Sequence, residues 1–165
     1  MSFHAPYSAK QVTVNYAAGD FSEGRPDDVF ITISESAPRA SFRKGVDGNT
    51  SAALSSDHSS QVTLSFFPES DSAKLFTNIY YALRSSQRGD SPTLGAYPLT
   101  IVDPSGSIIV EAVEAVMESM SDRSLGNDTG TIDFVFYVET LLGGSLPEEL
   151  AAEANKALGA LGVSV

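Results

Sequence analysis

The residue types that most often carry out catalysis or bind metals are few in this sequence and lie far apart. It has two histidines, His4 and His58, and no cysteine. Both histidines stand in polar segments, where a lone histidine is usually an exposed side chain and not a base or a metal ligand. Because cysteine is absent, disulfides, thiolate metal sites and thiol nucleophiles are all excluded.

The carboxylates form no catalytic or metal-binding pattern either. Asp27 and Asp28 follow a proline in a predicted loop, and Glu148 and Glu149 stand at a predicted helix start, where they favour the helix dipole. The sequence lacks a calcium-binding loop, a phosphate-binding loop and the Gly-x-Ser-x-Gly motif of hydrolases. We therefore predict a protein that is not an enzyme and needs no cofactor or metal. An enzyme with an unrecognised site stays an alternative, because catalytic groups can come together from distant parts of a chain.

Length, hydrophobicity and charge indicate one soluble domain. The chain has 165 residues, of which 42% are hydrophobic, enough for one core of ordinary size. No apolar run approaches the ~20 residues of a membrane-spanning helix, and Met1 to Lys10 lacks the pattern of a secretory signal. The net charge of −11 makes a poor binder of nucleic acid, because phosphate contacts need lysine and arginine. The charge either keeps the protein soluble or lets nucleic acid pass a surface without binding to it.

Alternating apolar and polar residues predict six strands. They span Lys10–Tyr16, Val29–Ser36, Ala40–Lys44, Gln61–Phe67, Tyr97–Val102 and Thr131–Thr140. Asp47 and Gly48 predict a turn, because glycine adopts positive φ without steric cost. The small and polar residues from Thr50 to Ser60 predict a long exposed loop.

Two helices are predicted. The first is capped by Ser70 or Asp71, which can accept hydrogen bonds from amides of the first turn, and it ends near Ser86. Its apolar stripe, expected to pack on a sheet, comprises Leu75, Phe76, Ile79, Tyr80 and Leu83. The second helix runs from near Pro147 to Leu161.

The stretch from Ser107 to Met120 is ambiguous. Its apolar residues fit one face of a helix, and its glutamates and alanines favour a helix locally. Yet residues 103–106, Asp-Pro-Ser-Gly, form a turn between two apolar runs, which is typical of a β-hairpin. The pattern alone slightly favours the helix. With either outcome the fold class is α+β, mainly β, with an antiparallel sheet or a small sandwich.

Several short segments, taken in order, form a recognisable series. They are Tyr7–Val12, Val29–Ile33, Gly45–Asn49, Gln61–Leu64, Lys74–Phe76, Val102–Gly106, Asp133–Phe136 and Leu142–Gly144. This series resembles the tail-tube (inner tube) protein of contractile-tailed bacteriophages. The resemblance implies a β-sandwich-like or barrel-like subunit with one flanking helix, whose strands join a shared inner β-barrel in a hexamer. It assigns a tail-tube domain to residues 1–144, with a long loop at about 46–60, and a C-terminal helical extension to 145–165. It also implies that Ser107–Met120 is a strand, which we adopt.

The resemblance implies a structural role in a virion. Stacked hexameric rings would form a tube that holds the tape-measure protein and lies inside the tail sheath protein. The tube would meet baseplate and tail-terminator proteins and conduct DNA during ejection without binding it specifically. The implied location is the virion tail, with synthesis in the host bacterial cytoplasm. The alternatives are a related ring protein, namely a tube initiator, a terminator or a secretion or bacteriocin tube, and a monomeric β-sandwich binding module.

Two sets of residues are expected to act in such an assembly. The lumen-lining candidates are Thr32, Ser34, Thr63, Ser65, Glu111 and Asp133. The opposite strand faces, with Ile31, Ile33, Val62, Leu64, Phe134 and Phe136, would pack under the first helix. The candidates for contacts between subunits are Arg39, Arg43, Lys44, Asp47, Asn49, Leu150 and Leu158. A negative lumen would repel DNA, which carries one charge per about 1.7 Å of its axis, and so prevent it from sticking.

Overall fold

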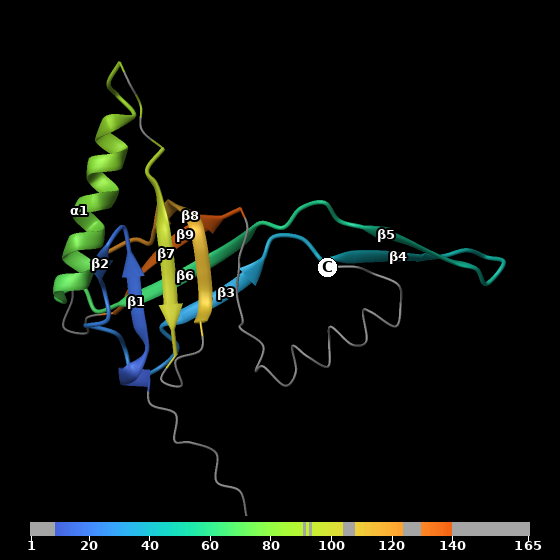
Figure 1. Ribbon diagram of the computed structural model, residues 1–165, viewed down its shortest axis with the longest axis horizontal. Coiled ribbons are helices and arrows are strands. Elements are labelled where there is room, and N and C mark those ends of the chain that lie inside the picture. Colours follow the sequence, from blue (N-terminus) through green and yellow to red (C-terminus); the bar gives the residue numbers. More distant parts are fainter. Residues whose placement is uncertain (1–8, 91, 93, 104–107, 124–129, 140–165) are drawn as a thin grey trace, which may run out of the picture.

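The protein folds into a main antiparallel sheet, a separate two-stranded hairpin and one α-helix. The computed structural model describes residues 9–90, 92, 94–103, 108–123 and 130–139. Seven strands of the main sheet follow the order β2-β1-β7-β8-β9-β6-β3, while β4 and β5 pair only with each other in this part of the chain (Figure 1). The strands are β1 Thr13–Tyr16, β2 Gly19–Asp20, β3 Ile31–Glu35, β4 Ala40–Lys44, β5 Thr50–Leu54, β6 Ser60–Phe66, β7 Ala96–Val102, β8 Ile108–Met120 and β9 Ile132–Val138. The predicted fold class, mainly β with one flanking helix, is confirmed.

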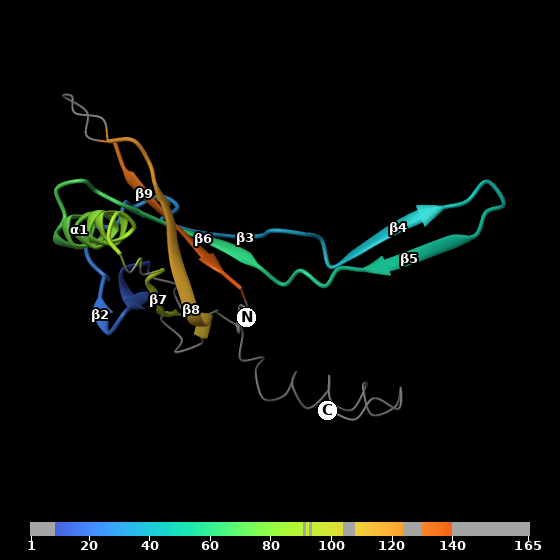
Figure 2. The ribbon, with the colours of Figure 1, turned by 90° about the horizontal axis from the view of Figure 1, so that it is seen from above.

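The helix α1, Asp71–Ser86, lies against one face of the main sheet (Figures 1 and 2). Phe76 is the centre of this contact and is fully buried. Its ring stacks on Phe21 at 3.9 Å between centroids and lies 5.2 Å from Phe134 and 5.6 Å from Phe136. Burial of several aromatic side chains at this point stabilises the contact between α1 and the sheet.

The start of α1 follows the sequence prediction. Ser70 is the N-cap residue, and its hydroxyl accepts a hydrogen bond from the amide of Ala73 at 3.2 Å. The apolar stripe is confirmed only in part, because Leu75 is 51% exposed. The helix axis is turned so that Phe76 lies at the middle of the contact and Leu75 at its outer margin.

The ambiguous stretch is the strand β8, which pairs with β7 on one side and β9 on the other. A β-bulge at Val113 and Glu114 shifts the phase of its side chains. Its buried residues are consequently Val110, Ala112, Ala115 and Met117. The apolar residues that fitted a helix were Ile109, Val113, Val116, Met117 and Met120, and of these only Met117 is buried. Apolar side chains thus lie on both faces of β8, so the strand lacks the clean alternation that would have predicted it.

The loop predicted over Thr50 to Ser60 is wrong in its first half. Residues 50–54 form β5, which is antiparallel to β4: Ala40 pairs with Leu54 at one end, and Lys44 pairs with Thr50 at the other. Small and polar residues hid this strand, because a strand with both faces in solvent has no apolar alternation. The predicted helix at 147–161 lies outside the described residues. Within those residues, no helix is long and apolar enough to cross a membrane.

Candidate functional site

Five of the six lumen-lining candidates lie together on the face of the main sheet opposite α1. Thr32 of β3 pairs with Thr63 of β6, and Ser65 of β6 pairs with Asp133 of β9. Ser34 shares the face with Thr32, because side chains two residues apart lie on the same side of a strand. The structure therefore brings these five residues into one polar field across three neighbouring strands.

A hydrogen bond positions the acidic member of this field. The Ser65 hydroxyl donates to Asp133 Oδ1 at 2.6 Å. The Asp133 amide in turn donates to Ser121 Oγ at 2.9 Å, which holds the start of β9 next to the end of β8. The carboxylate is thus held on the open side of the sheet.

The other face of the same strands is apolar, as predicted from the alternation. Val62, Leu64, Phe134 and Phe136 are fully buried. Ile33 departs from this pattern with 38% exposure, because β3 is the last strand of the sheet and α1 lies over the strands further in.

Glu111 lies on the β7–β8 side of the main sheet, apart from the other five candidates. It pairs with Thr100 of β7 in the half of β8 that continues beyond the last pair with β9, Ala115 with Val138. It is exposed. The sequence could not show this separation, because it depends on how far β9 runs along β8.

The strand β3 leaves one edge of the main sheet open. On one side it pairs with β6, from Ile31 with Leu64 to Glu35 with Ser60. No strand in the described residues pairs with its other side. Residues 32–35 are exposed. An open edge presents free backbone N–H and C=O groups that can pair with a strand of another chain.

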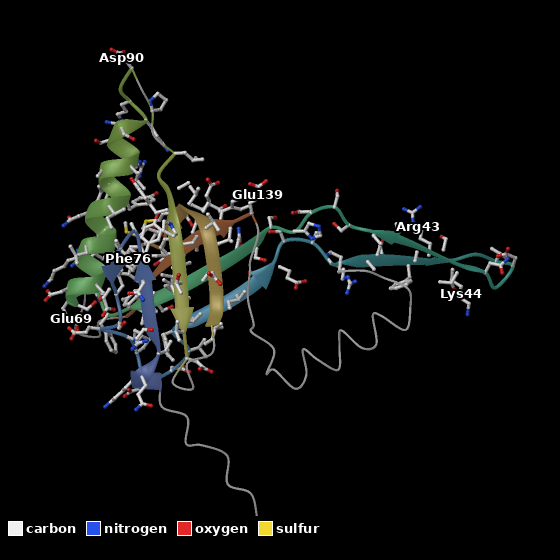
Figure 3. The ribbon with its side chains drawn as sticks, in the orientation of Figure 1. Arg43, Lys44, Glu69, Phe76, Asp90 and Glu139 are labelled. Atoms are coloured by element: carbon white, nitrogen blue, oxygen red, sulfur yellow. The ribbon has the colours of Figure 1, made fainter. Side chains whose placement is uncertain are left out.

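The hairpin of β4 and β5 projects away from the main sheet and carries five of the predicted contact residues (Figures 1 and 2). Arg39, Arg43 and Lys44 are all exposed on it, and Figure 3 shows the last two standing out from its strands. Its apolar side chains are exposed too: Phe42 by 71%, Leu54 by 78%.

The tip of the hairpin is held by hydrogen bonds within a few residues. The Gly45 amide donates to the Asn49 carbonyl at 2.7 Å, and Asn49 Nδ2 donates to Asp47 Oδ2 at 2.6 Å. The Asn49 side chain and then its amide lower the pKa of Asp47 below its usual range, because they stabilise the carboxylate. Asp47 and Asn49 therefore shape the turn itself. The contact candidates Leu150 and Leu158 lie outside the described residues.

One of the two histidines lies within the described residues. His58 is exposed in the connection between β5 and β6, and His4 lies outside the described residues. Next to His58, the Ser59 hydroxyl and amide donate to Asp57 at 2.6 Å and 2.9 Å and lower the pKa of that carboxyl. No group of three or more histidine or acidic side chains that could hold a metal occurs in the described residues.

The sequence analysis did not predict one feature of the surface. A depression of about 390 Å³ lies on the exposed side of β7, β8 and β9. It is lined by Leu94, Ala96, Glu114, Val116, Glu118, Tyr137 and Glu139, and we refer to it as the acidic-rimmed depression. Gln61 Nε2 donates to Glu118 Oε2 at 2.9 Å at its margin. The helical interpretation of residues 107–120 concealed it, because in a strand Glu114, Val116 and Glu118 share one face and Val116 pairs with Tyr137.

Comparison with solved structures shows a shared fold. A chain of the anti-feeding prophage cap, a tube-terminating cap, matches with a TM-score of 0.50 and 12% identity over 86% of this chain and 92% of that chain. A chain of the sheath/tube terminator of PVC, an extracellular contractile injection system in its extended state, matches with a TM-score of 0.51 and 13% identity. That match covers 86% of this chain and 98% of the other. No protein-family model matches the chain, and no curated protein matches it.

Proposed function

We propose that this protein is a structural subunit of the tube of a contractile tail or a related injection machine, and that it assembles with copies of itself. The observation that carries the proposal is the main sheet itself. One face is buried under α1, the other is a polar field, and the β3 edge beside that field is open. A sheet of this kind can continue into the next subunit, which removes its open edge.

The finer proposal follows the phage tail-tube resemblance. Hexameric rings stack into a tube, since a contact between unlike surfaces that does not close gives a filament. The field of Thr32, Ser34, Thr63, Ser65 and Asp133 faces the lumen in this proposal, and Glu111, which pairs with Thr100 of β7, lies outside that field. Neutral and acidic side chains offer DNA phosphates no cation to bind, so DNA passes without being retained.

The same proposal names the partners and the location. The tube lies in the virion tail inside the sheath protein, holds the tape-measure protein, and joins baseplate and terminator proteins at its ends. The shared fold with chains of contractile injection systems supports this setting. The role is structural, without catalysis.

A second candidate is a terminator that closes the end of the tube. The two structures with which the fold is shared are a tube-terminating cap and a sheath/tube terminator, which favours this candidate. A terminator forms one ring and stops, whereas a tube protein stacks rings without limit.

Electron microscopy of the purified full chain over a range of concentrations tests both candidates. Long hollow tubes support the tube subunit, and single rings that do not lengthen with concentration support the terminator. A stable monomer at the highest concentration would contradict both, and would favour a monomeric binding module.

A further inference from the structure

The tip of the β4–β5 hairpin contains a peptide bond whose two residues favour a covalent rearrangement. The sequence has one Asp-Gly pair, Asp47–Gly48, and no Asn-Gly pair. The backbone nitrogen that follows an aspartate can attack the carboxyl carbon of its side chain. Glycine permits this attack best, because it has no Cβ to shield the nitrogen. The hairpin tip is therefore a candidate site for isoaspartate formation.

The rearrangement is a balanced exchange of bonds that needs only water. A bond forms between the Gly48 nitrogen and Asp47 Cγ, the carboxyl Cγ–O bond breaks, and one water leaves with the amide proton. The product is a five-membered succinimide. Water then opens this ring at the former backbone carbonyl of Asp47, so that the chain continues through Cγ and a carboxylate stands on Cα. One water leaves and one enters, so the isoaspartyl chain has the same mass as the original.

The structure leaves this bond accessible to attack and to water. All residues from 41 to 54 are exposed. Gly48 has φ +83°, and a Cβ placed on it would meet no atom within 4 Å. The hairpin projects away from the main sheet, so among the described residues no other element covers its tip (Figures 1 and 2). Burial therefore does not protect the bond.

Hydrogen bonds within the turn hold the reacting groups in an unreactive state. The Asn49 amide donates to Asp47 Oδ1 at 3.2 Å, and Asn49 Nδ2 donates to Oδ2 at 2.6 Å. Both bonds favour the ionised carboxylate, whereas the step that releases water needs the protonated carboxyl. The Gly48 amide donates to the Gly45 carbonyl at 3.1 Å. Attack requires the Asp47 side chain to leave Asn49 and the Gly48 amide to leave Gly45.

We propose that Asp47–Gly48 is the site at which this protein forms isoaspartate, and that Asn49 restrains the reaction in the folded chain. Asn49 is a positioning residue, because it holds the Asp47 carboxylate and does not itself react. The reaction takes place within one subunit, so it goes beyond the proposed assembly and does not depend on it.

Isoaspartate at position 47 changes the hairpin tip and leaves the core intact. The rearrangement adds one methylene to the backbone before Gly48 and removes the side-chain carboxylate that Asn49 binds. The bond that closes the turn, from the Gly45 amide to the Asn49 carbonyl at 2.7 Å, spans this lengthened segment. Amides at residues 45–49 should therefore exchange faster with solvent in aged protein.

Ageing of the full chain tests both the site and the role of Asn49. The unchanged protein, Asn49→Ala and Asn49→Ser are incubated at near-neutral pH, digested, and analysed by electron-transfer fragmentation, which distinguishes isoaspartate from aspartate of equal mass. Isoaspartate at position 47 should form about 10-fold faster in Asn49→Ala, the factor for one hydrogen bond to a charged group. Asn49→Ser should stay within about threefold of the unchanged protein, because a serine hydroxyl can donate to the same carboxylate.

A matched control lies in the connection before β6. Asp57 accepts hydrogen bonds from the Ser59 hydroxyl at 2.6 Å and the Ser59 amide at 2.9 Å, also two residues on, but His58 and not glycine follows it. Ser59→Ala should therefore form less isoaspartate at position 57 than Asn49→Ala forms at position 47. If the two positions react equally, in the folded and in the urea-unfolded chain, the site is wrong. If the unchanged protein and Asn49→Ala react equally at position 47, the restraint is wrong.

The pH profile separates an effect on the carboxylate from a general loosening of the turn. The side chain of Asn49 and then its amide lower the pKa of Asp47, so at pH values above the usual range the unchanged protein has a smaller protonated fraction than Asn49→Ala. The ratio of the two rates should be largest there. It should fall as the pH drops through the lowered pKa, below which both proteins carry a protonated carboxyl. A ratio that does not change with pH would overturn the role of Asn49 in holding the carboxylate.

Discussion

The main sheet and the β4–β5 hairpin are both antiparallel β-structure, yet they are stabilised in different ways. Every strand of the main sheet except the two-residue β2 contributes to one core or packs against it, and Phe76 of α1 lies at its centre. The strands of the hairpin are exposed throughout, apart from a half-buried Ala40. Ordering a chain costs entropy that burial normally offsets. The difference indicates that the main sheet folds by its own burial, whereas the hairpin has almost no burial within its own subunit among the described residues.

Truncating one aromatic side chain in each region should give the largest contrast. Phe76→Ala removes the ring that contacts Phe21, Phe134 and Phe136, and should lower the free energy of unfolding by about 3–5 kcal/mol. Phe42→Ala should leave the unfolding of the monomer within about 0.5 kcal/mol, because the side chain is 71% exposed. Urea denaturation under conditions that keep the protein dissociated measures both.

In an assembly assay, Phe42→Ala should have a large effect although it hardly changes the stability of the monomer. Phe42→Ala is expected to reduce the formation of rings or tubes, seen by electron microscopy, without a change in monomer stability. Loss of monomer stability in Phe42→Ala comparable to that in Phe76→Ala would show that the hairpin packs on its own subunit.

Substitution of two glycines with positive φ should give a smaller difference in stability between the main fold and the hairpin. Gly24 has φ +77°, and a Cβ there would clash with the Ser70 side chain at the start of α1. Gly48 has φ +83° at the hairpin tip, and a Cβ there would meet nothing. Gly24→Ala should destabilise the fold by about 2–3 kcal/mol through strain and overpacking. Gly48→Ala should cost about 1 kcal/mol and act only on the hairpin. Urea midpoints together with amide exchange at residues 45–49 separate the two, and a shifted midpoint for Gly48→Ala would contradict this division.

The sequence predicted the main sheet better than its margins, for reasons that differ from place to place. Alternation predicted the strands β4, β6 and β9, and capping chemistry predicted the N-cap at Ser70. Both signals depend only on residues close together in the sequence. The strand β2 was missed because the turn before it uses Ala17 and Ala18 at φ +49° and +66°, without the glycine or asparagine that normally marks such a turn.

The sequence predicted on which face of its strand each candidate lies, but it did not predict which candidates are neighbours across strands. Alternation correctly separated the polar field from the apolar face, because both are properties of a single strand. Whether Glu111 joins that field, and whether Glu114 joins Glu139, depends on strand order and on the bulge in β8. Those features arise from long-range pairing, which residue spacing alone does not contain.

Titration of a core tyrosine should weaken the main sheet at high pH. Burial, with Tyr97 as the second cause, raises the pKa of Tyr16 to about 12. The unfolded value is about 10, so the folded protein keeps a proton that the unfolded chain gives up. The contribution of Tyr16 to stability is therefore full below pH 10 and falls as the pH rises toward 12. Unfolding followed at several pH values should show this fall in the unchanged protein and less of it in Tyr16→Phe. Equal pH dependence in both would mean that other groups cause it.

The smallest effect is expected at the tip of the hairpin. Asp47→Ala removes the acceptor of the Asn49 amide and side chain, at 3.2 Å and 2.6 Å, so amides at residues 45–49 should exchange faster with solvent. Because these bonds hold the pKa of Asp47 below its usual range, the turn should be fully formed above that range and loosen as the pH falls through the lowered value. The urea midpoint should not change, since the tip contributes nothing to the core. Asp57→Ala, which removes a similar carboxylate in the connection before β6, is the control and should leave exchange at 45–49 unaltered. If assembly also slows in Asp47→Ala, the shape of the tip matters for association between copies.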